Sequence, residues 1–223
     1  MSKVNLFALG LFLFTIGVQA KNHEIEKGIA PEQAIKFLQN GNARFQSGKL
    51  RKDGQGKADI ARLSKGQKPH SIVLSCSDSR VPPEVVFDQK LGEIFVVRTA
   101  GESIDASAIA SIEYAVEHLG SRLILVMGHS HCGAVKAALS TFGGKDAGSP
   151  HLNKLVADIQ PRIQEFSRAP ASDDVKQPSW ANAKGVARDL LLRSEIIRKK
   201  VDSGDVAVKS ALYDLRSGGV EVE

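Results

Sequence analysis

The stretch that decides the fold reads RLILVMG at residues 122–128, an apolar run of strand length that ends at a glycine. Three further runs of this kind stand in the chain: SIVLS at 71–75, IFVVR at 94–98 and a last one at 206–213. Short apolar runs without strict polar alternation are typical of strands that are buried on both faces, as in parallel sheets. The sequence therefore predicts four strands of a mostly parallel β-sheet.

Segments with the apolar spacing of helices separate these strands. Between the second and third runs, Asp105 is a typical N-cap and Gly120 a typical stop for an amphipathic helix. Residues 48–66 are polar and predict a loop with a short helical piece. The other predicted helices cover residues 31–45, 132–139, 152–166 and 181–201. Strands that alternate with helices predict an α/β fold, with helices on both faces of the sheet.

Length and composition are those of an ordinary globular protein. The chain has 223 residues, of which 42% are hydrophobic and 25% charged, so it is long enough for one domain with a sizeable core. Its net charge of +5 is spread along the chain and is not gathered into a basic stripe with interleaved aromatic residues. A nucleic-acid partner is therefore not expected.

The first twenty residues have the pattern of a secretory signal peptide. Lys3 supplies the positive start, residues 6–18 form an apolar core, and Val18-Gln19-Ala20 is a small-x-small cleavage site. The apolar run is shorter than the roughly 20 residues of a membrane span, so no stable membrane anchor is expected, although an uncleaved anchor is the alternative. We predict a signal peptide at residues 1–20, a single catalytic domain at 21–223, and a periplasmic or secreted protein.

The chemistry is concentrated in two motifs that follow predicted strands. Cys76-Ser77-Asp78-Ser79-Arg80 follows the first strand, and His129-Ser130-His131-Cys132-Gly133 follows the third. The carboxyl ends of parallel strands meet at one edge of a sheet, which would bring these motifs together. Two thiolates and one imidazole suit zinc, and three protein ligands leave a fourth position open, as in catalytic sites. We therefore expect Cys76, His129 and Cys132 to bind zinc.

An aspartate and an arginine that can form an ion pair follow the first of these ligands. Asp78 lies two residues after Cys76, and Arg80 can clamp its carboxylate with a forked pair of hydrogen bonds. A carboxylate held in this way stays ionised and can accept a hydrogen bond from the proton of a hydroxide on the metal, which would orient the lone pair of that oxygen towards an electrophile. Without Cys76 the pair would be no more than a surface ion pair in a turn.

These motifs together resemble the β-class carbonic anhydrases. CSDSR at 76–80 and GHSHCG at 128–133 carry the resemblance, and FVVRTAGE, SIEYAVEHLG and YDLRSGGVE also match the style of the family. The resemblance spans roughly residues 31–220, judged against the α/β pattern. It implies a zinc lyase that interconverts carbon dioxide and bicarbonate. It also implies a homodimer across which the sheet is extended, and which can pair again into a homotetramer.

The resemblance also implies roles for individual residues. Cys76, His129 and Cys132 match the zinc ligands, and Asp78 and Arg80 match the catalytic dyad. The further matches concern the substrate pocket and the proton path. Gln67 matches an amide that donates to substrate, Phe95 and Tyr114 match pocket walls contributed in part by the partner subunit, Gly133 matches a backbone N–H that faces substrate, and His118 matches a proton relay. Each of these five also has an ordinary structural explanation as a loop, core, turn or helix-end residue.

Three positions qualify the resemblance. Thr99 stands where the family often has Asn, so the hydrogen bonds there can differ. Val73 stands where one subgroup has a Trp, and in that subgroup the Asp binds zinc at lower pH. We therefore predict the open form, with Asp78 paired to Arg80. His131 is adjacent to Cys132 and is not expected to be a ligand, because the spacing of His129 and Cys132 suits a tetrahedral site better.

Three other functions remain open at the level of sequence. The same fold could hydrolyse another small linear electrophile such as carbon disulfide, which only an assay separates. A cysteine phosphatase is disfavoured, because its arginine would fall at Pro82 and not at Arg80. A redox or disulfide protein is the third alternative, since two cysteines suffice for one bridge.

Overall fold

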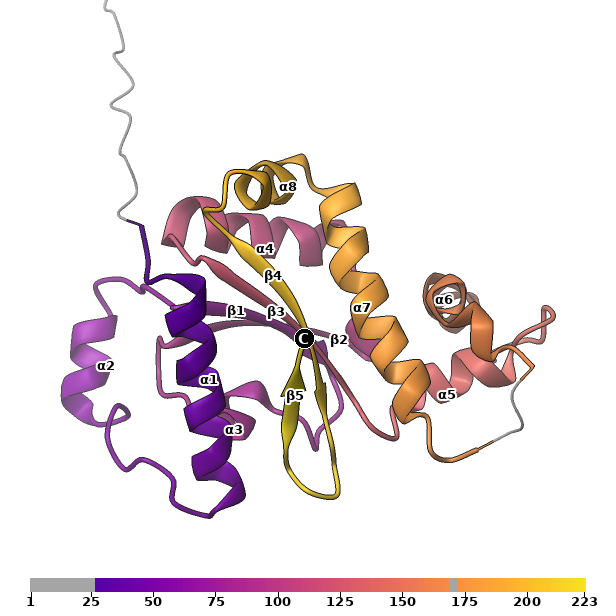
Figure 1. Cartoon of the computed structure of the whole chain (residues 1–223), viewed down its shortest axis with the longest axis horizontal. Helices are drawn as coiled ribbons and strands as arrows, with labels where there is room; N and C mark the ends of the chain where they lie inside the picture. The colour runs from indigo at the N-terminus through magenta and orange to yellow at the C-terminus, as the bar shows by residue number, and fades with distance from the viewer. Residues whose placement is uncertain (1–26, 169–171) are drawn as a thin grey trace, which may run out of the picture.

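A computed structural model describes residues 27–168 and 172–223, and the predicted signal peptide lies outside them. The described chain forms one sheet of order β2-β1-β3-β4-β5 (Figure 1). The first four strands are parallel to their neighbours, whereas β5 is antiparallel to β4. The strands are β1 (Ser71–Cys76), β2 (Ile94–Thr99), β3 (Leu123–His129), β4 (Ala207–Tyr213) and β5 (Val220–Val222). The mostly parallel α/β fold is thus confirmed.

Helices lie on both faces of this sheet and beyond its carboxyl edge (Figure 1). They are α1 (Pro31–Gln46), α2 (Lys57–Leu63), α3 (Pro83–Val86), α4 (Ala106–Leu119), α5 (Gly133–Ser140), α6 (Pro150–Ile159), α7 (Lys176–Arg193) and α8 (Glu195–Asp202), with 3-10 turns η1 (Ala100–Glu102) and η2 (Gln160–Phe166). In the described chain, no helix is long and apolar enough to cross a membrane.

Alternating side chains of the central strands supply two separate cores. Ile72 and Leu74 of β1 pack with α4, α7 and α8, whereas Val73 between them packs with α1 and the end of α3. This alternation is the period of two that any strand imposes. All six residues of β1 and all seven of β3 are buried, which explains why both strands read as continuous apolar runs.

A third apolar cluster lies beyond the carboxyl ends of the strands. We call it the satellite core, and its buried members are Cys76, Cys132, Val135, Ala138, Val156, Ile159, Ile163 and Val175. It joins the end of β1 to α5, α6 and η2. Two of the predicted metal ligands therefore belong to this cluster and not to either main core.

The predicted helix boundaries hold where caps are strong and fail where a break was overlooked. Asp105 accepts from the Ala108 N–H at 2.8 Å, and Gly120 ends α4 in the left-handed region at φ 72°, as predicted. The single helix expected at 181–201 is wrong. The helical segment begins at Lys176 and is divided at Ser194 into α7 and α8. Ser194 caps the second helix, because its Oγ accepts from the Ile197 N–H at 3.1 Å.

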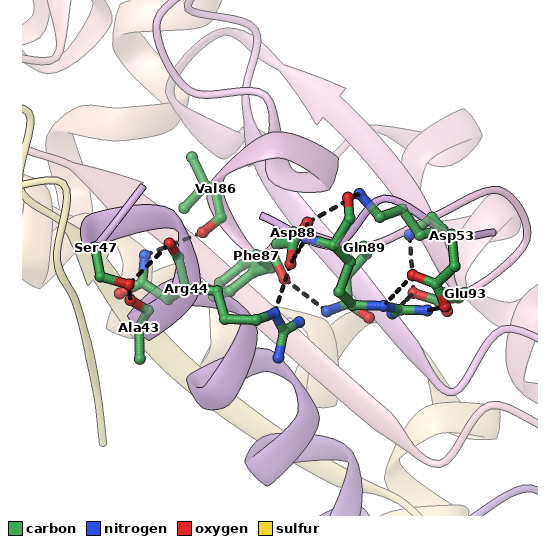
Figure 2. Close-up of polar contacts among 12 residues, drawn as sticks. Ala43, Arg44, Ser47, Asp53, Val86, Phe87, Asp88, Gln89 and Glu93 are labelled. Carbon is green, nitrogen blue, oxygen red and sulfur yellow. Dashed lines mark hydrogen bonds and ion pairs between the residues drawn. The ribbon is translucent and has the colours of Figure 1, made fainter. Parts of the chain in front are cut away.

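A buried carboxylate ties α1 to the segment between α3 and β2 (Figure 2). Asp88 has a side chain only 1% exposed and accepts from Arg44 Nε at 2.6 Å and from Lys90 Nζ at 3.0 Å. The helix approaches this segment closely, because a Cβ on Gly41 would lie 1.7 Å from the Phe87 carbonyl oxygen. Glycine at position 41 is therefore required for α1 to pack here.

Candidate metal centre

The sheet brings the two sequence motifs together where its strand order reverses. β1 is followed in sequence by β2 on one side and, after α4 has crossed over it, by β3 on the other. Cys76 is the last residue of β1, and His129 is the last residue of β3. In parallel sheets ligands bind beyond the carboxyl ends of strands at such a reversal. The strands thus place two residues 53 positions apart in sequence beside each other.

Cys76, His129 and Cys132 form a buried cluster whose ligand atoms all lie within 4.8 Å of one another. His129 and Cys132 are 0% and 1% exposed. His129 Nδ1 lies 2.9 Å from the Ser130 carbonyl oxygen and donates to it, so in the neutral ring Nε2 carries the free lone pair. That Nε2 is buried without a hydrogen-bond partner. A buried acceptor beside two sulfur atoms fits a cation that prefers nitrogen and sulfur ligands.

Both cysteines are free thiols, so the disulfide alternative is not what the structure shows. A hydrogen bond from the Cys132 thiol lowers the pKa of Cys76, and burial opposes this only in part. The same hydrogen bond, together with burial, raises the pKa of Cys132. The hydrogen bond thus places the thiol proton of Cys132 between the two sulfurs. A divalent cation would replace that proton and deprotonate both thiols.

Asp78 and Arg80 form the predicted pair at the rim of the cluster. Arg80 Nε donates to Asp78 Oδ1 at 2.9 Å, and Nη2 donates to Oδ2 at 2.7 Å. These hydrogen bonds lower the pKa of Asp78 to about 2. Asp78 Oδ2 also lies 3.9 Å from His129 Nε2. An ionised oxygen therefore lies beside the point where the ligand atoms converge, and the predicted pairing is confirmed.

Arg98 supports this loop from the neighbouring strand, a role that was not predicted. Its Nε donates to the Cys76 carbonyl at 3.0 Å, and its Nη2 donates to the Asp78 carbonyl at 2.6 Å. The strand register explains why Arg98 reaches these carbonyls. Arg98 in β2 pairs with Ser75 in β1, so it lies beside the end of β1. An arginine at the end of an otherwise apolar strand was the signal available in the sequence.

The turn after β2 provides a second support that was not predicted. The Gly101 N–H donates to Cys76 Sγ at 3.4 Å. Glu102 is fully buried, and burial, together with the charge of Cys76, raises its pKa to about 8. Its Oε1 accepts from Asn182 Nδ2 at 2.8 Å, whereas Oε2 is buried without a partner. A charged residue within FVVRTAGE was visible in the sequence, but nothing indicated that it is buried.

Of the remaining predicted site residues, Gly133 lies at this cluster and four others do not. Gly133 begins α5 directly after Cys132, and a Cβ added there would meet nothing within 4 Å. Phe95 pairs with Ile72 near the start of β1. At about 3.3 Å per strand residue, it lies roughly 13 Å along β2 from Thr99, the residue that pairs with Cys76. Gln67 precedes β1 and so lies at the edge of the sheet where the parallel strands begin, which we call the far edge.

Tyr114 and His118 also lie towards the far edge. Both are on α4, which runs from the carboxyl edge back to the start of β3, and their rings are 5.1 Å apart. Tyr114 is 49% exposed. Within one chain, therefore, Gln67, Phe95, Tyr114 and His118 lie away from the metal ligands, towards the edge at which the strands begin.

The structure shows the surroundings of the three positions that depart from the resemblance or compete with it, namely His131, Thr99 and Val73. His131 lies outside the ligand cluster, and its Nδ1 lies 2.8 Å from the Asp173 carbonyl oxygen. Thr99 Oγ1 donates to the Ser103 carbonyl at 2.6 Å, so it closes the turn that follows β2. Val73 is fully buried in the core beneath α1.

Comparisons with known proteins agree with this geometry. A sequence model of the family described as carbonic anhydrase matches residues 71–220. A carbonic anhydrase of Mycolicibacterium smegmatis is 38% identical over 192 residues, which are 86% of this chain and 93% of the relative. The protein named carbonic anhydrase 2 of Mycobacterium tuberculosis is 36% identical over 188 residues, 84% of this chain and 90% of the relative.

Solved structures give the same result for the fold. A β-carbonic anhydrase of Aspergillus fumigatus superposes with a TM-score of 0.65 at 27% identity, covering 74% of this chain and 79% of that one. A Coccomyxa β-carbonic anhydrase in complex with acetazolamide gives 0.64 at 26% identity, covering 73% and 75%. A β-carbonic anhydrase of Sordaria macrospora, described as tetrameric, gives 0.63 at 25% identity, covering 73% and 84%.

Proposed function

The chain belongs to the β class of the carbonic anhydrase family, and we propose that it hydrates carbon dioxide with a zinc ion held by Cys76, His129 and Cys132. One observation carries the assignment of the metal. These residues form a buried Cys–His–Cys cluster with an unpartnered His129 Nε2, 3.9 Å from an ionised Asp78. Nitrogen and sulfur ligands in this number suit zinc and leave one position for substrate chemistry. Zinc, when bound, acts as a Lewis acid that lowers the pKa of a coordinated water from 15.7 to roughly 7.

Asp78 orients the attacking oxygen. Its Oδ2 would accept a hydrogen bond from that oxygen, so that a lone pair would face the carbon of carbon dioxide. Arg80 keeps the carboxylate ionised and fixes its plane through two hydrogen bonds, at 2.9 and 2.7 Å. Because the pKa of Asp78 is lowered to about 2, the carboxylate accepts a hydrogen bond at neutral pH without taking the proton away. Its role is therefore orientation.

The substrate pocket needs residues that one chain does not bring to the metal ligands. The Gly133 N–H lies at the start of α5, and the role we propose for it is to donate to a substrate oxygen. Gln67, Phe95 and Tyr114 lie at the opposite edge, and all six residues of β2 at the end of the sheet are partly exposed. We assign the pocket to two copies of the chain, one giving the ligands and the other giving these three side chains. The proton leaves through His118 or through solvent.

The first experiment measures zinc content and carbon dioxide hydration on the same preparation. We expect about one zinc per chain, hydration that acetazolamide inhibits, and a fall of about 10²- to 10⁴-fold for Asp78→Ala with zinc retained. Asp59→Ala is the matched control, since it removes another exposed aspartate–arginine pair, Asp59 with Arg62 at 3.2 Å. A metal-free wild type, or an Asp78→Ala enzyme of full activity, contradicts the proposal.

The second experiment tests whether two chains complete one pocket. Cys76→Ala removes a ligand, and Tyr114→Ala removes an aromatic wall, so each variant alone is expected to be poorly active. A heterodimer purified through two different tags should regain about half of wild-type activity, because one of its two sites is then intact. A heterodimer no more active than the Tyr114→Ala homodimer would place Tyr114 outside the partner's site.

We also propose that residues 1–20 are a cleaved signal peptide and that the enzyme is exported. The support is the sequence pattern of Lys3, the apolar core and Val18-Gln19-Ala20. In a Gram-negative host, the mature protein should be found in the periplasmic fraction with Lys21 as its first residue. A chain that retains Met1 in the membrane fraction would indicate an uncleaved anchor instead.

A further inference from the structure

Asn182, far from the metal ligands in sequence, is connected to Cys76 through two hydrogen bonds. The first link is the turn η1, where the Gly101 N–H points at Cys76 Sγ at 3.4 Å. Gly101 and Glu102 both have left-handed backbone, with φ of 60° and 44°. Such a conformation is uncommon for a residue with a side chain, and two in succession persist only where the surroundings fix them.

Asn182 fixes this turn with both hydrogens of its amide. It lies on α7, is fully buried, and donates from Nδ2 to the Gly101 carbonyl at 2.9 Å and to Glu102 Oε1 at 2.8 Å. The turn is also confined from the other side, because a Cβ on Gly101 would lie 2.8 Å from Ile159 Cδ1. The position of the Gly101 N–H therefore depends on the asparagine amide.

Arg162 fixes which way this amide points. Its Nη1 approaches Asn182 Oδ1 at 3.5 Å, while its Nε donates to Asp189 at 2.7 Å and its Nη1 to Asp158 at 3.1 Å. The arginine side chain is only 6% exposed and lies against Gly185, where a Cβ would be 2.6 Å from Arg162 Cδ. With Oδ1 towards the guanidinium, Nδ2 faces the turn.

We propose that Asn182 is a positioning residue for the Cys76 thiolate, acting through the Gly101 N–H. A hydrogen bond to a thiolate draws electron density from the sulfur, so it sets how strongly Cys76 donates to a bound cation. It also prevents the sulfur from turning away from His129 and Cys132. This inference rests on the proposed metal site and adds to it a residue from α7.

The test measures metal binding directly, with zinc and with cobalt(II) as probes. In Asn182→Ala we expect zinc affinity, measured by competition with a chromophoric chelator, to fall about 10- to 100-fold. We also expect the thiolate-to-cobalt charge-transfer band to move to longer wavelength, since a sulfur that has lost its hydrogen bond is a stronger donor. A merely structural role would leave the band of the cobalt-loaded protein in place.

Asn42→Ala is the matched control. Asn42 is also buried, and its Nδ2 also donates to two carbonyls, those of Val86 at 3.0 Å and Gly218 at 2.9 Å, but it lies beneath the opposite face of the sheet. It should lose stability without a change in zinc affinity or band position. Equal losses of zinc affinity in the two variants would overturn the proposal, and so would an unchanged Asn182→Ala.

Asn182→Ser keeps the experiment decisive if Asn182→Ala does not fold. The hydroxyl leaves a smaller hole and a single donor, so the same band shift is expected at smaller size, and an unmoved band with full affinity would refute the inference. The wild type distinguishes a failure of the proposed function from a failure of the role of Asn182. A wild-type chain that binds neither metal refutes the proposed function, whereas normal binding by wild type and Asn182 variants alike refutes only the role of Asn182.

Discussion

Arg98→Met tests whether the loop that carries Asp78 is held from β2. Methionine keeps the unbranched apolar stem of the arginine but removes both donors to the backbone carbonyls of Cys76 and Asp78, at 3.0 and 2.6 Å. The ligand side chain and the carboxylate themselves are untouched. Any change in activity must therefore come from the position of the loop.

The magnitude follows from the two hydrogen bonds. A hydrogen bond from a charged donor contributes about 1.5–3 kcal/mol, so two give about 3–6 kcal/mol. Arg98 is only partly buried, so water can solvate in part the carbonyl groups that lose the guanidinium. We therefore expect the free energy of unfolding to fall by an amount near the lower end, about 3 kcal/mol. For a domain of this size that lowers Tm by about 6–12 °C. A displacement of about 1 Å at Asp78 would reduce the rate about 100-fold.

The assay is hydration rate per bound zinc, with Tm measured on the same samples, so that slow catalysis is separated from metal loss. Arg122→Met is the matched control, because Arg122 is partly buried and donates from Nε to the Asp205 carbonyl at 2.7 Å, at the opposite edge of the sheet. It should lower Tm and leave the rate unchanged. If Arg98→Met loses stability and still turns over at the wild-type rate, the carbonyl contacts do not position Asp78.

Three further predictions concern packing, acid stability and the metal. Gly41→Ala should destabilise the fold by about 3 kcal/mol, seen as a lower urea midpoint, because its Cβ would lie 1.7 Å from the Phe87 carbonyl oxygen. Burial raises the pKa of Asp88, but hydrogen bonds from Arg44 and Lys90 outweigh it and hold that pKa below 3.8, so its contribution is present above about pH 4 and is lost as pH falls further. Urea titrations between about pH 6 and pH 3 should therefore show a smaller decline for Asp88→Asn than for wild type. Both thiols should react with a thiol reagent only after a chelator removes the metal, and immediate reaction in the zinc-loaded protein would contradict the ligand assignment.

The sequence predicts most of the sheet because its strands are buried on both faces. SIVLS and RLILVMG contain unbroken apolar stretches, IVL and LILVM, because β1 and β3 are buried on both faces, and that is the pattern a sequence reveals best. β5 was not predicted, because three residues at an edge, Val220–Val222, carry no such pattern. The break at Ser194 was also missed, because a serine is compatible with a continuous helix unless its capping bond is known.

The candidate site divides in the same way. Cys76, His129 and Cys132 could be brought together from sequence, because residues that end parallel strands must meet at one edge. The supports of the thiolate could not. Asn182 lies 81 positions after Gly101, and its hydrogen bond to that carbonyl depends on how α7 packs. Side-chain contacts between distant elements leave no periodicity in the sequence, so only the structure reveals them.

The separation of the satellite core from the two main cores has a consequence for how the protein ages. Regions of a fold open independently, with free energies that range from near zero to that of global unfolding. The satellite core contains both thiols, and its other members come from α5, α6, η2 and Val175. Opening these helices alone would expose Cys76 and Cys132 to oxidants while the sheet stays folded. Resistance to oxidation then depends on this local opening, so the Tm of the whole domain is a poor guide to the working lifetime of the site.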